Sequence, residues 1–155
     1  MQNRLDLYVP FIYLLAAIPY AWLGLSAWRE RPAIAVTPFV WTMLGMSLWS
    51  FTYGVEIFFT SPPIKVFLAK IEYFGIVSIP IFLLLFSLEF IGKSHLLNKR
   101  HRLLLWAFPL LILLLVWTNE YHHLMWSSET VITISGLSLL NIEYGPFFWI
   151  HVVFT

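Results

Sequence analysis

Three residues whose side chains could take part in binding or proton chemistry share one face of an otherwise apolar segment. Trp49, Tyr53 and Glu56 are spaced i, i+4 and i+7, which places them on the same side of a helix. Gly45 lies one turn earlier and leaves room for a second helix to approach closely. A carboxyl group inside an apolar segment is costly unless it faces a partner or a cavity. We therefore expect this face to look inward and to contribute to sensing a ligand or signal.

The next apolar segment carries a second group of candidates. Lys70 and Tyr73 are spaced i, i+3 and are expected to point together, whereas Glu72 must face elsewhere, toward the hydrated outer interface. Glu56 lies about four residues before the end of its segment and Lys70 about four residues after the start of the next, so a helical hairpin brings them to similar depth. Two alternatives follow, which do not exclude one another: an ion pair between Glu56 and Lys70, or a direct role in a ligand pocket.

A polar run from 118 to 126 follows the fourth apolar segment. His122 and His123 have side chains that can bind a metal or titrate near neutral pH. Adjacent histidines on a helix diverge by about 100°, however, and no regular metal-binding spacing is present. We therefore favour an interfacial cap, in which Asn119 caps the loop and Trp126 belongs to an aromatic belt.

The sequence contains no motif that is typical of a catalytic site. His151 lies in the last apolar run and is a further candidate for signal sensing. The short polar loops contain no glycine-rich phosphate loop, no nucleophile elbow and no pair of aspartates at metal spacing. We expect no catalytic residue, no metal and no cofactor in this chain.

The composition is that of a membrane protein. Of the 155 residues, 60% are hydrophobic, 19% are aromatic and only 11% are charged, against about 25% charged residues in an ordinary soluble domain. The absence of cysteine excludes disulfides and thiolate chemistry. A net charge of +1 gives no reason to expect a nucleic-acid partner, so the lipid bilayer is the expected environment.

The apolar runs predict an all-α fold, a polytopic bundle of transmembrane helices. A complete span needs about 20 apolar residues, and the last run is too short to cross. The chain is therefore expected to be a fragment with four complete spans and the start of a fifth. The predicted spans are 5–28, 38–60, 66–91, 103–118 and 145–155. In the loop between the last two, residues 130–140 alternate as a short strand pair would.

The basic residues predict the orientation of the bundle. Two of the nine lie in the loop 29–31 and four in the loop 93–102, so six lie on one side of the membrane. The loop 119–144 contains no lysine or arginine. The positive-inside rule then places the N-terminus and the loop 119–144 outside, and the two basic loops in the cytoplasm.

An ordered set of phrases along the chain resembles the N-terminal seven-transmembrane sensor region of bacterial membrane histidine kinases. Similar regions also precede diguanylate cyclase modules. The phrases are Trp49-x3-Tyr53-x2-Glu56, Lys70-x-Glu72-Tyr73-Phe74-Gly75, Thr118-Asn119 with His122-His123-Leu124-x-Trp126, and Tyr144-Gly145-Pro146 through Trp149-Ile150-His151.

The resemblance implies that residues 1–155 are a partial seven-transmembrane sensor domain, truncated in the fifth span, in the cytoplasmic (inner) membrane of a bacterium. It implies a signal-input role in a two-component system with an unknown small-molecule signal. Two further spans and a cytoplasmic module, a PAS domain with a kinase or cyclase, would follow, and such kinases generally act as homodimers. The full-length protein would then be an enzyme, although this part carries no catalytic motif.

Two other classes of membrane protein compete with this interpretation. A transporter fragment would use the same intramembrane charges to line a path, but it predicts inverted repeats and broken helices, and the sequence shows neither. A polytopic membrane enzyme needs ligands gathered at one face of the membrane. His95 and His101 are predicted inside, whereas His122 and His123 are predicted outside.

Overall fold

Long helices and one β-hairpin make up the fold of the computed structural model, which describes residues 8–154. In chain order the elements are α1 (Val9–Trp28), α2 (Val36–Glu56), α3 (Pro62–Phe90), the 3-10 turn η2 (Ser94–Leu96), α4 (Lys99–Trp117), α5 (Asn119–His122), β1 (Trp126–Ile134), β2 (Leu137–Tyr144) and α6 (Pro146–Phe154).

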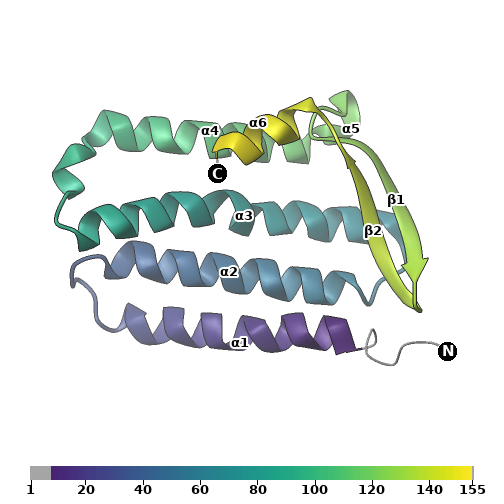
Figure 1. Ribbon diagram of the computed structural model, residues 1–155, viewed down its shortest axis with the longest axis horizontal. Helices are drawn as coiled ribbons and strands as arrows, with labels where there is room; N and C mark the ends of the chain where they lie inside the picture. The colour runs from purple at the N-terminus through teal and green to yellow at the C-terminus, as the bar shows by residue number, and fades with distance from the viewer. Residues whose placement is uncertain (1–7, 155) are drawn as a thin grey trace.

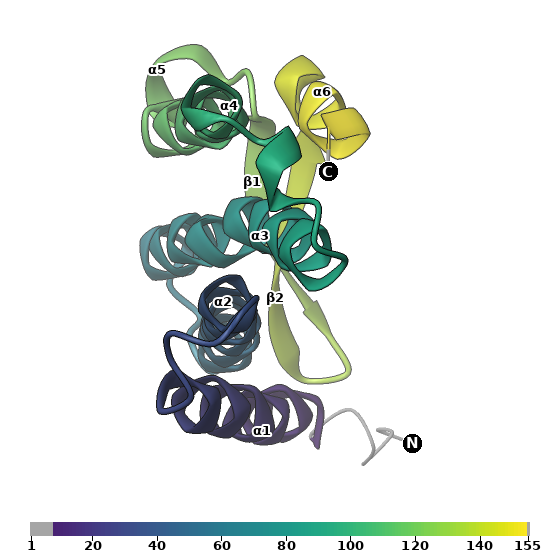
Figure 2. The same cartoon turned by 90° about the vertical axis from the view of Figure 1, so that its left-hand side faces the viewer.

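The four long helices lie side by side in chain order and alternate in direction (Figure 1). The β-hairpin covers the end of the bundle where α2 ends and α3 begins, and the two basic loops lie at the opposite end. Figure 2 shows β2 and α6 on the same face of the bundle. A buried cluster ties α3 and α4 to the start of β1, and it comprises Ala69, Tyr73, Val77, Ile112, Val116, Met125 and Trp126.

Local signals explain where the helices begin and end. Pro62 occupies the first position of α3, where its missing N–H leaves no hydrogen bond unmade. At the other end of α3, Gly92 takes a positive φ of 71°, which is favourable only for glycine and stops the helix. Asn98 caps α4, and its side chain accepts a hydrogen bond from the backbone N–H of His101 at 2.9 Å.

Small residues let α2 and α3 pack closely. A Cβ at Gly75 would lie 2.6 Å from the carbonyl oxygen of Gly45, and 3.2 Å from the Cβ of Trp49. The prediction that Gly45 admits a neighbouring helix is therefore confirmed. Ser47 and Ser50 of α2 donate hydrogen bonds of 2.9 and 3.0 Å to backbone carbonyls of α1. Close backbone approach and interhelical hydrogen bonds are the usual means of association between membrane helices.

The hairpin corrects the all-α prediction. β1 and β2 pair antiparallel, with Ile134 opposite Leu137 and Trp126 opposite Tyr144. Ser135 and Gly136 both take positive φ, at 51° and 85°, as a two-residue turn with the twist of the strands requires. The alternation noted at 130–140 therefore marked a real strand pair, which extends further in both directions.

The observed helices follow the predicted spans with shifted ends. Three of the described helices, α1, α3 and α4, are long and apolar enough to cross a membrane by length and composition. α2 has 21 residues but is not among them, and its serine and threonine side chains account for part of the difference. Four complete spans therefore remain a prediction, and residues 5–7 and 155 of the predicted spans lie outside the described part.

Replacing Gly75 with alanine should destabilise the contact between α2 and α3. The added methyl group would meet the Gly45 carbonyl, and overpacking of this kind costs about 1–3 kcal/mol. The free energy of unfolding in detergent, followed by circular dichroism, measures the loss. Ser87→Ala, at an exposed position of the same helix, is the control and should change stability little. Equal stability of the two variants would contradict the close approach.

Candidate functional site

A cavity of about 450 Å³ lies between α2, α3, β2 and α6. We call it the hairpin cavity. Its volume is in the range of small-molecule sites, about 300–1,000 Å³. The side chains that line it are mainly aromatic or aliphatic, with two carboxyl groups and one imidazole among them. They are Trp49, Tyr53, Glu56, Ala69, Glu72, Tyr73, Ile76, Leu140, Ile142, Tyr144, Phe148, His151 and Val152.

Five of the six predicted signal-sensing residues meet in this cavity. Trp49, Tyr53 and Glu56 enter it from α2 on the shared face that their spacing predicts, Tyr73 enters from α3, and His151 enters from α6. The sixth, Lys70, does not line the hairpin cavity. Residues about 100 positions apart in the chain are thus brought together by the packing of three helices.

Glu56 pairs with Lys65, so the predicted pair between Glu56 and Lys70 is wrong. The ammonium group of Lys65 lies 2.6 Å from Oε1 of Glu56, and both side chains are buried. The same ammonium donates to the backbone carbonyls of Glu56 at 2.9 Å and of Ser138 at 2.7 Å. α3 begins four residues before the predicted start of this span, which places Lys65 in its first turn.

Lys70 points to the other side of α3. Its ammonium forms an ion pair with Glu120 in α5 and also lies 3.5 Å from the backbone carbonyl of Trp117. The reason is the pitch of the helix, since Lys65 and Lys70 are five residues apart and therefore about 140° apart around α3. Lys70 thus secures the end of α4 to α3, outside the hairpin cavity.

Glu72 was expected to face hydrated surroundings, and the structure places it inside the hairpin cavity. Only 7% of the residue is exposed. Its Oε1 atom is buried and has no hydrogen-bond partner within residues 8–154. A signal was present in the sequence, because Lys65, Glu72 and Tyr73 are separated by seven and eight residues and share one helix face. The carboxyl group of Glu72 is therefore a functional candidate that sequence reasoning missed.

Tyr73 links the cavity to the loop that follows α4. Its hydroxyl accepts a hydrogen bond from the indole Nε1 of Trp126 at 3.3 Å, and the ring centroids are 5.5 Å apart. On its other side, the ring centroid lies 6.0 Å from that of His151, which is 4% exposed. Trp126 is fully buried, so it serves as core between α3 and the hairpin and does not belong to an aromatic belt.

Asn119 organises the loop after α4, as expected of a capping residue. Its side-chain oxygen accepts hydrogen bonds of 3.1 Å from the backbone N–H groups of Met125 and Trp126. Its amide nitrogen donates to the carbonyl of Trp126 at 2.9 Å and to Glu129 at 3.0 Å. The residue is 1% exposed, and these side-chain hydrogen bonds hold the start of β1 in place.

The two adjacent histidines have structural roles. Nδ1 of His122 accepts a hydrogen bond from the backbone N–H of Leu124 at 3.0 Å, and Nε2 lies 3.1 Å from the hydroxyl of Thr118. His123 takes a positive φ of 53° at the end of α5. Within residues 8–154, no group of three or more histidine, aspartate or glutamate side chains is placed to hold a metal ion.

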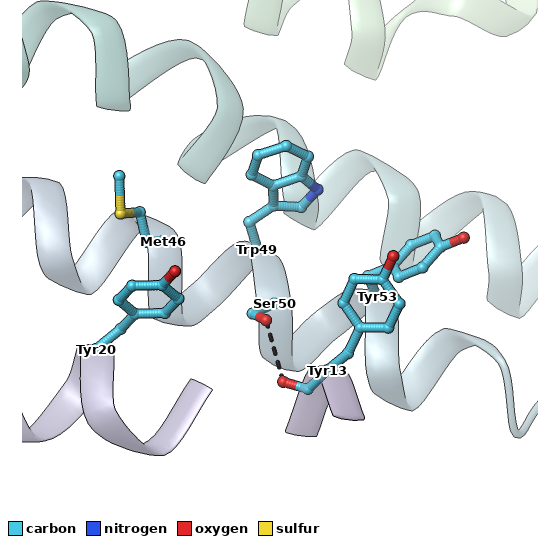
Figure 3. A pocket seen from close by; sticks show the side chains of 6 residues that line it. All are labelled: Tyr13, Tyr20, Met46, Trp49, Ser50 and Tyr53. Atoms are coloured by element: carbon cyan, nitrogen blue, oxygen red, sulfur yellow. Dashed lines mark hydrogen bonds between the residues drawn. The ribbon is translucent and has the colours of Figure 1, made fainter. Parts of the chain in front are cut away.

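A second, smaller cavity of about 300 Å³ lies between α1 and α2 (Figure 3). Tyr13, Tyr20, Met46, Trp49, Ser50 and Tyr53 line it. Tyr53 packs edge-on against Tyr13, with ring centroids 4.6 Å apart. The lining contains no charged side chain. Trp49 and Tyr53 line both cavities and form part of the wall between them.

Removing one partner of the Lys65–Glu56 pair should be strongly destabilising. Lys65→Met leaves a buried carboxylate without its cation, which costs about 3–5 kcal/mol of unfolding free energy. The double variant with Glu56→Leu should recover much of this loss, because neither charge is then left alone. A double-mutant cycle in detergent measures the coupling. Strictly additive losses would contradict the pairing. The partly exposed Lys70–Glu120 pair is the comparison, with a coupling of about 0–1 kcal/mol.

The Lys70–Glu120 pair should also make stability depend on pH. The hydrogen bond from Lys70 lowers the pKa of Glu120 below its usual value of 4.5. The pair therefore stabilises the fold fully above that value, and the contribution is lost as the pH falls through the lower pKa of the folded state. We expect the difference in melting temperature between the wild type and Glu120→Gln to shrink on acidification. A difference that grows in acid would contradict the shift.

One comparison with known proteins identifies the family. A family model described as the N-terminal 7TM region of histidine kinase matches residues 12–155. No curated protein and no solved structure matches the chain. The matched region includes every candidate residue discussed above, and the resemblance noted in the sequence is confirmed. The apolar helices and this match together indicate a multi-pass membrane protein with a sensor-type domain. The chain belongs to the family of N-terminal seven-transmembrane regions of histidine kinases.

Proposed function

We propose that this chain is the signal-input domain of a sensor histidine kinase and that its stimulus acts at the hairpin cavity. The observation that carries the proposal is the buried Oε1 atom of Glu72, which has no hydrogen-bond partner within residues 8–154, in a residue that lines a cavity of ligand size. Unpaired polar groups are costly inside a protein, and they are retained where they serve a function. All the residues that line the cavity lie within the family match.

The orientation follows from the charge distribution. Both basic loops lie at one end of the bundle and the hairpin lies at the other (Figure 1). With the basic loops in the cytoplasm, the hairpin cavity opens near the outer face of a bacterial cytoplasmic membrane. A small molecule outside the cell, or one dissolved in the outer leaflet, then reaches the site without crossing the membrane.

Transmission runs through α6. One wall of the cavity is the closely packed α2–α3 pair, and the opposite wall is β2 with α6. α6 leads away from the hairpin toward the end of the bundle where the basic loops lie (Figure 1). A ligand that contacts both walls shifts the position of α6 against α3, and it biases a two-state bundle by its difference in affinity for the two states. The output is a kinase module, preceded by a PAS domain, in a homodimeric full-length protein.

A transporter fragment is the less well supported alternative. Transporter sites are built from discontinuous helices near the middle of the membrane. In contrast, α1, α3 and α4 each continue through an internal proline, at Pro19, Pro80 and Pro109. Nothing in the described residues favours a path for ions or substrates over a closed input domain.

Filling the cavity should change the output of the full-length kinase. Ala69 lines the cavity and is buried, so Ala69→Phe places a ring between α3 and α6. We expect the basal rate of autophosphorylation in proteoliposomes to change about fivefold or more, in either direction, as for a typical allosteric coupling. Ala107→Phe adds the same ring at an exposed position of α4 and is the control. Equal rates for the wild type and both correctly inserted variants would refute the input role of the cavity.

A further inference from the structure

The charges around the hairpin cavity do not balance. Glu56 and Glu72 both line it, and no lysine or arginine does. Glu56 is balanced by Lys65, whose ammonium makes three short contacts, to Oε1 and the carbonyl of Glu56 and to the carbonyl of Ser138. An ammonium group has three N–H donors, so Lys65 has none left for another acceptor. The nearest other lysine in α3, Lys70, is paired with Glu120.

Within residues 8–154, Glu72 therefore faces the cavity without an ion pair to a lysine or arginine. The residue is 93% buried, and its Oε1 atom has no partner in the described part of the chain. A carboxylate in such a place needs a positive charge to offset the water it has lost. His151 is the one lining residue that can itself become a cation, and its ring lies beside that of Tyr73.

The rest of the lining favours an organic cation over an inorganic ion. Five aromatic rings surround the space, those of Trp49, Tyr53, Tyr73, Tyr144 and Phe148. Aromatic faces attract cations electrostatically and also bury apolar groups, which is why ammonium ligands are bound in aromatic cages. Within residues 8–154, no three or more histidine, aspartate or glutamate side chains are grouped to hold a metal ion, and a metal ion would leave most of the 450 Å³ empty.

We propose that the hairpin cavity binds an organic amine with an apolar body, with the carboxylate of Glu72 as its counter-ion and the aromatic rings as its walls. This inference rests on the proposed function, since it assigns a ligand class to the same cavity. Binding joins Glu72 of α3 to the rings of Tyr144 and Phe148 at the hairpin and α6. The ligand thus contacts both walls whose relative position carries the signal.

The test compares probes that share the same apolar part and differ in the polar group at one end, which is cationic, neutral or anionic. One set is 2-phenylethylamine, 2-phenylethanol and phenylacetate, and the other is hexylamine, hexanol and hexanoate. Equilibrium binding to the full-length kinase in nanodiscs is measured for each, with empty nanodiscs to correct for partitioning into lipid. We expect an amine to bind at least about tenfold more tightly than its alcohol and its acid.

Variants connect this preference to the cavity. Glu72→Gln keeps the size of the side chain and should abolish the preference for the amine over the alcohol. Glu143→Gln, an exposed carboxyl of β2 outside the cavity, should preserve it. Tyr53→Leu should weaken amine binding without reversing the preference, and it provides a second measurement if Glu72→Gln does not fold.

Several results would overturn the assignment: no amine binding above empty nanodiscs, equal binding of the amine and the alcohol, or a preference for the acid. An amine preference that survives both Glu72→Gln and Tyr53→Leu would also overturn it, and would place the cation elsewhere. These outcomes are distinct from failure of the proposed function. If Ala69→Phe changes autophosphorylation but no amine binds, the ligand class alone is wrong; if Ala69→Phe has no effect, the input role of the cavity falls.

Discussion

The hairpin end of the bundle depends on the hydrogen bonds and ion pair of the buried Lys65 ammonium group. It lies where the end of α2, the start of α3 and the first residues of β2 meet, and it donates to two oxygens of Glu56 and to the carbonyl of Ser138. A fully buried charge is stable only when its donors are all satisfied. The Glu56 carboxylate and two backbone carbonyls meet that need, and in doing so they hold the hairpin against the helices.

This arrangement also creates the functional feature of the site. Because Lys65 is committed to Glu56 and the hairpin, and Lys70 to Glu120, neither lysine is available to Glu72. The hairpin that Lys65 holds in place contributes β2 to the cavity wall. Lys65 therefore helps to enclose the cavity, and among the described residues Glu72 inside it has no ion pair. Lys65 and Glu72 are seven residues, about two turns, apart on α3, so in the proposed function one helix face serves both stability and sensing.

Much of the site was predictable from local spacing. The i, i+4, i+7 pattern of Trp49, Tyr53 and Glu56 placed one wall correctly, and Asn119 was correctly expected to cap the loop. The partner of Glu56 and the position of Glu72 were not predictable in the same way. Both depend on how α3 is rotated about its axis. Successive side chains on the helix point about 100° apart, so a shift of one residue changes which neighbour a side chain meets. An argument from depth alone could not choose between Lys65 and Lys70, which point to different neighbours.

The sequence by itself determined the membrane character of the chain, the long helices and the family, because apolar composition, helix signals and ordered motifs are local properties. The tertiary structure decided which charges pair, that the loop 119–144 folds as a hairpin over the helix ends, and that Glu72 enters a cavity. These features need contacts between residues far apart in the chain. Such contacts depend on how helices rotate and pack against one another, which the spacing within a single helix does not specify.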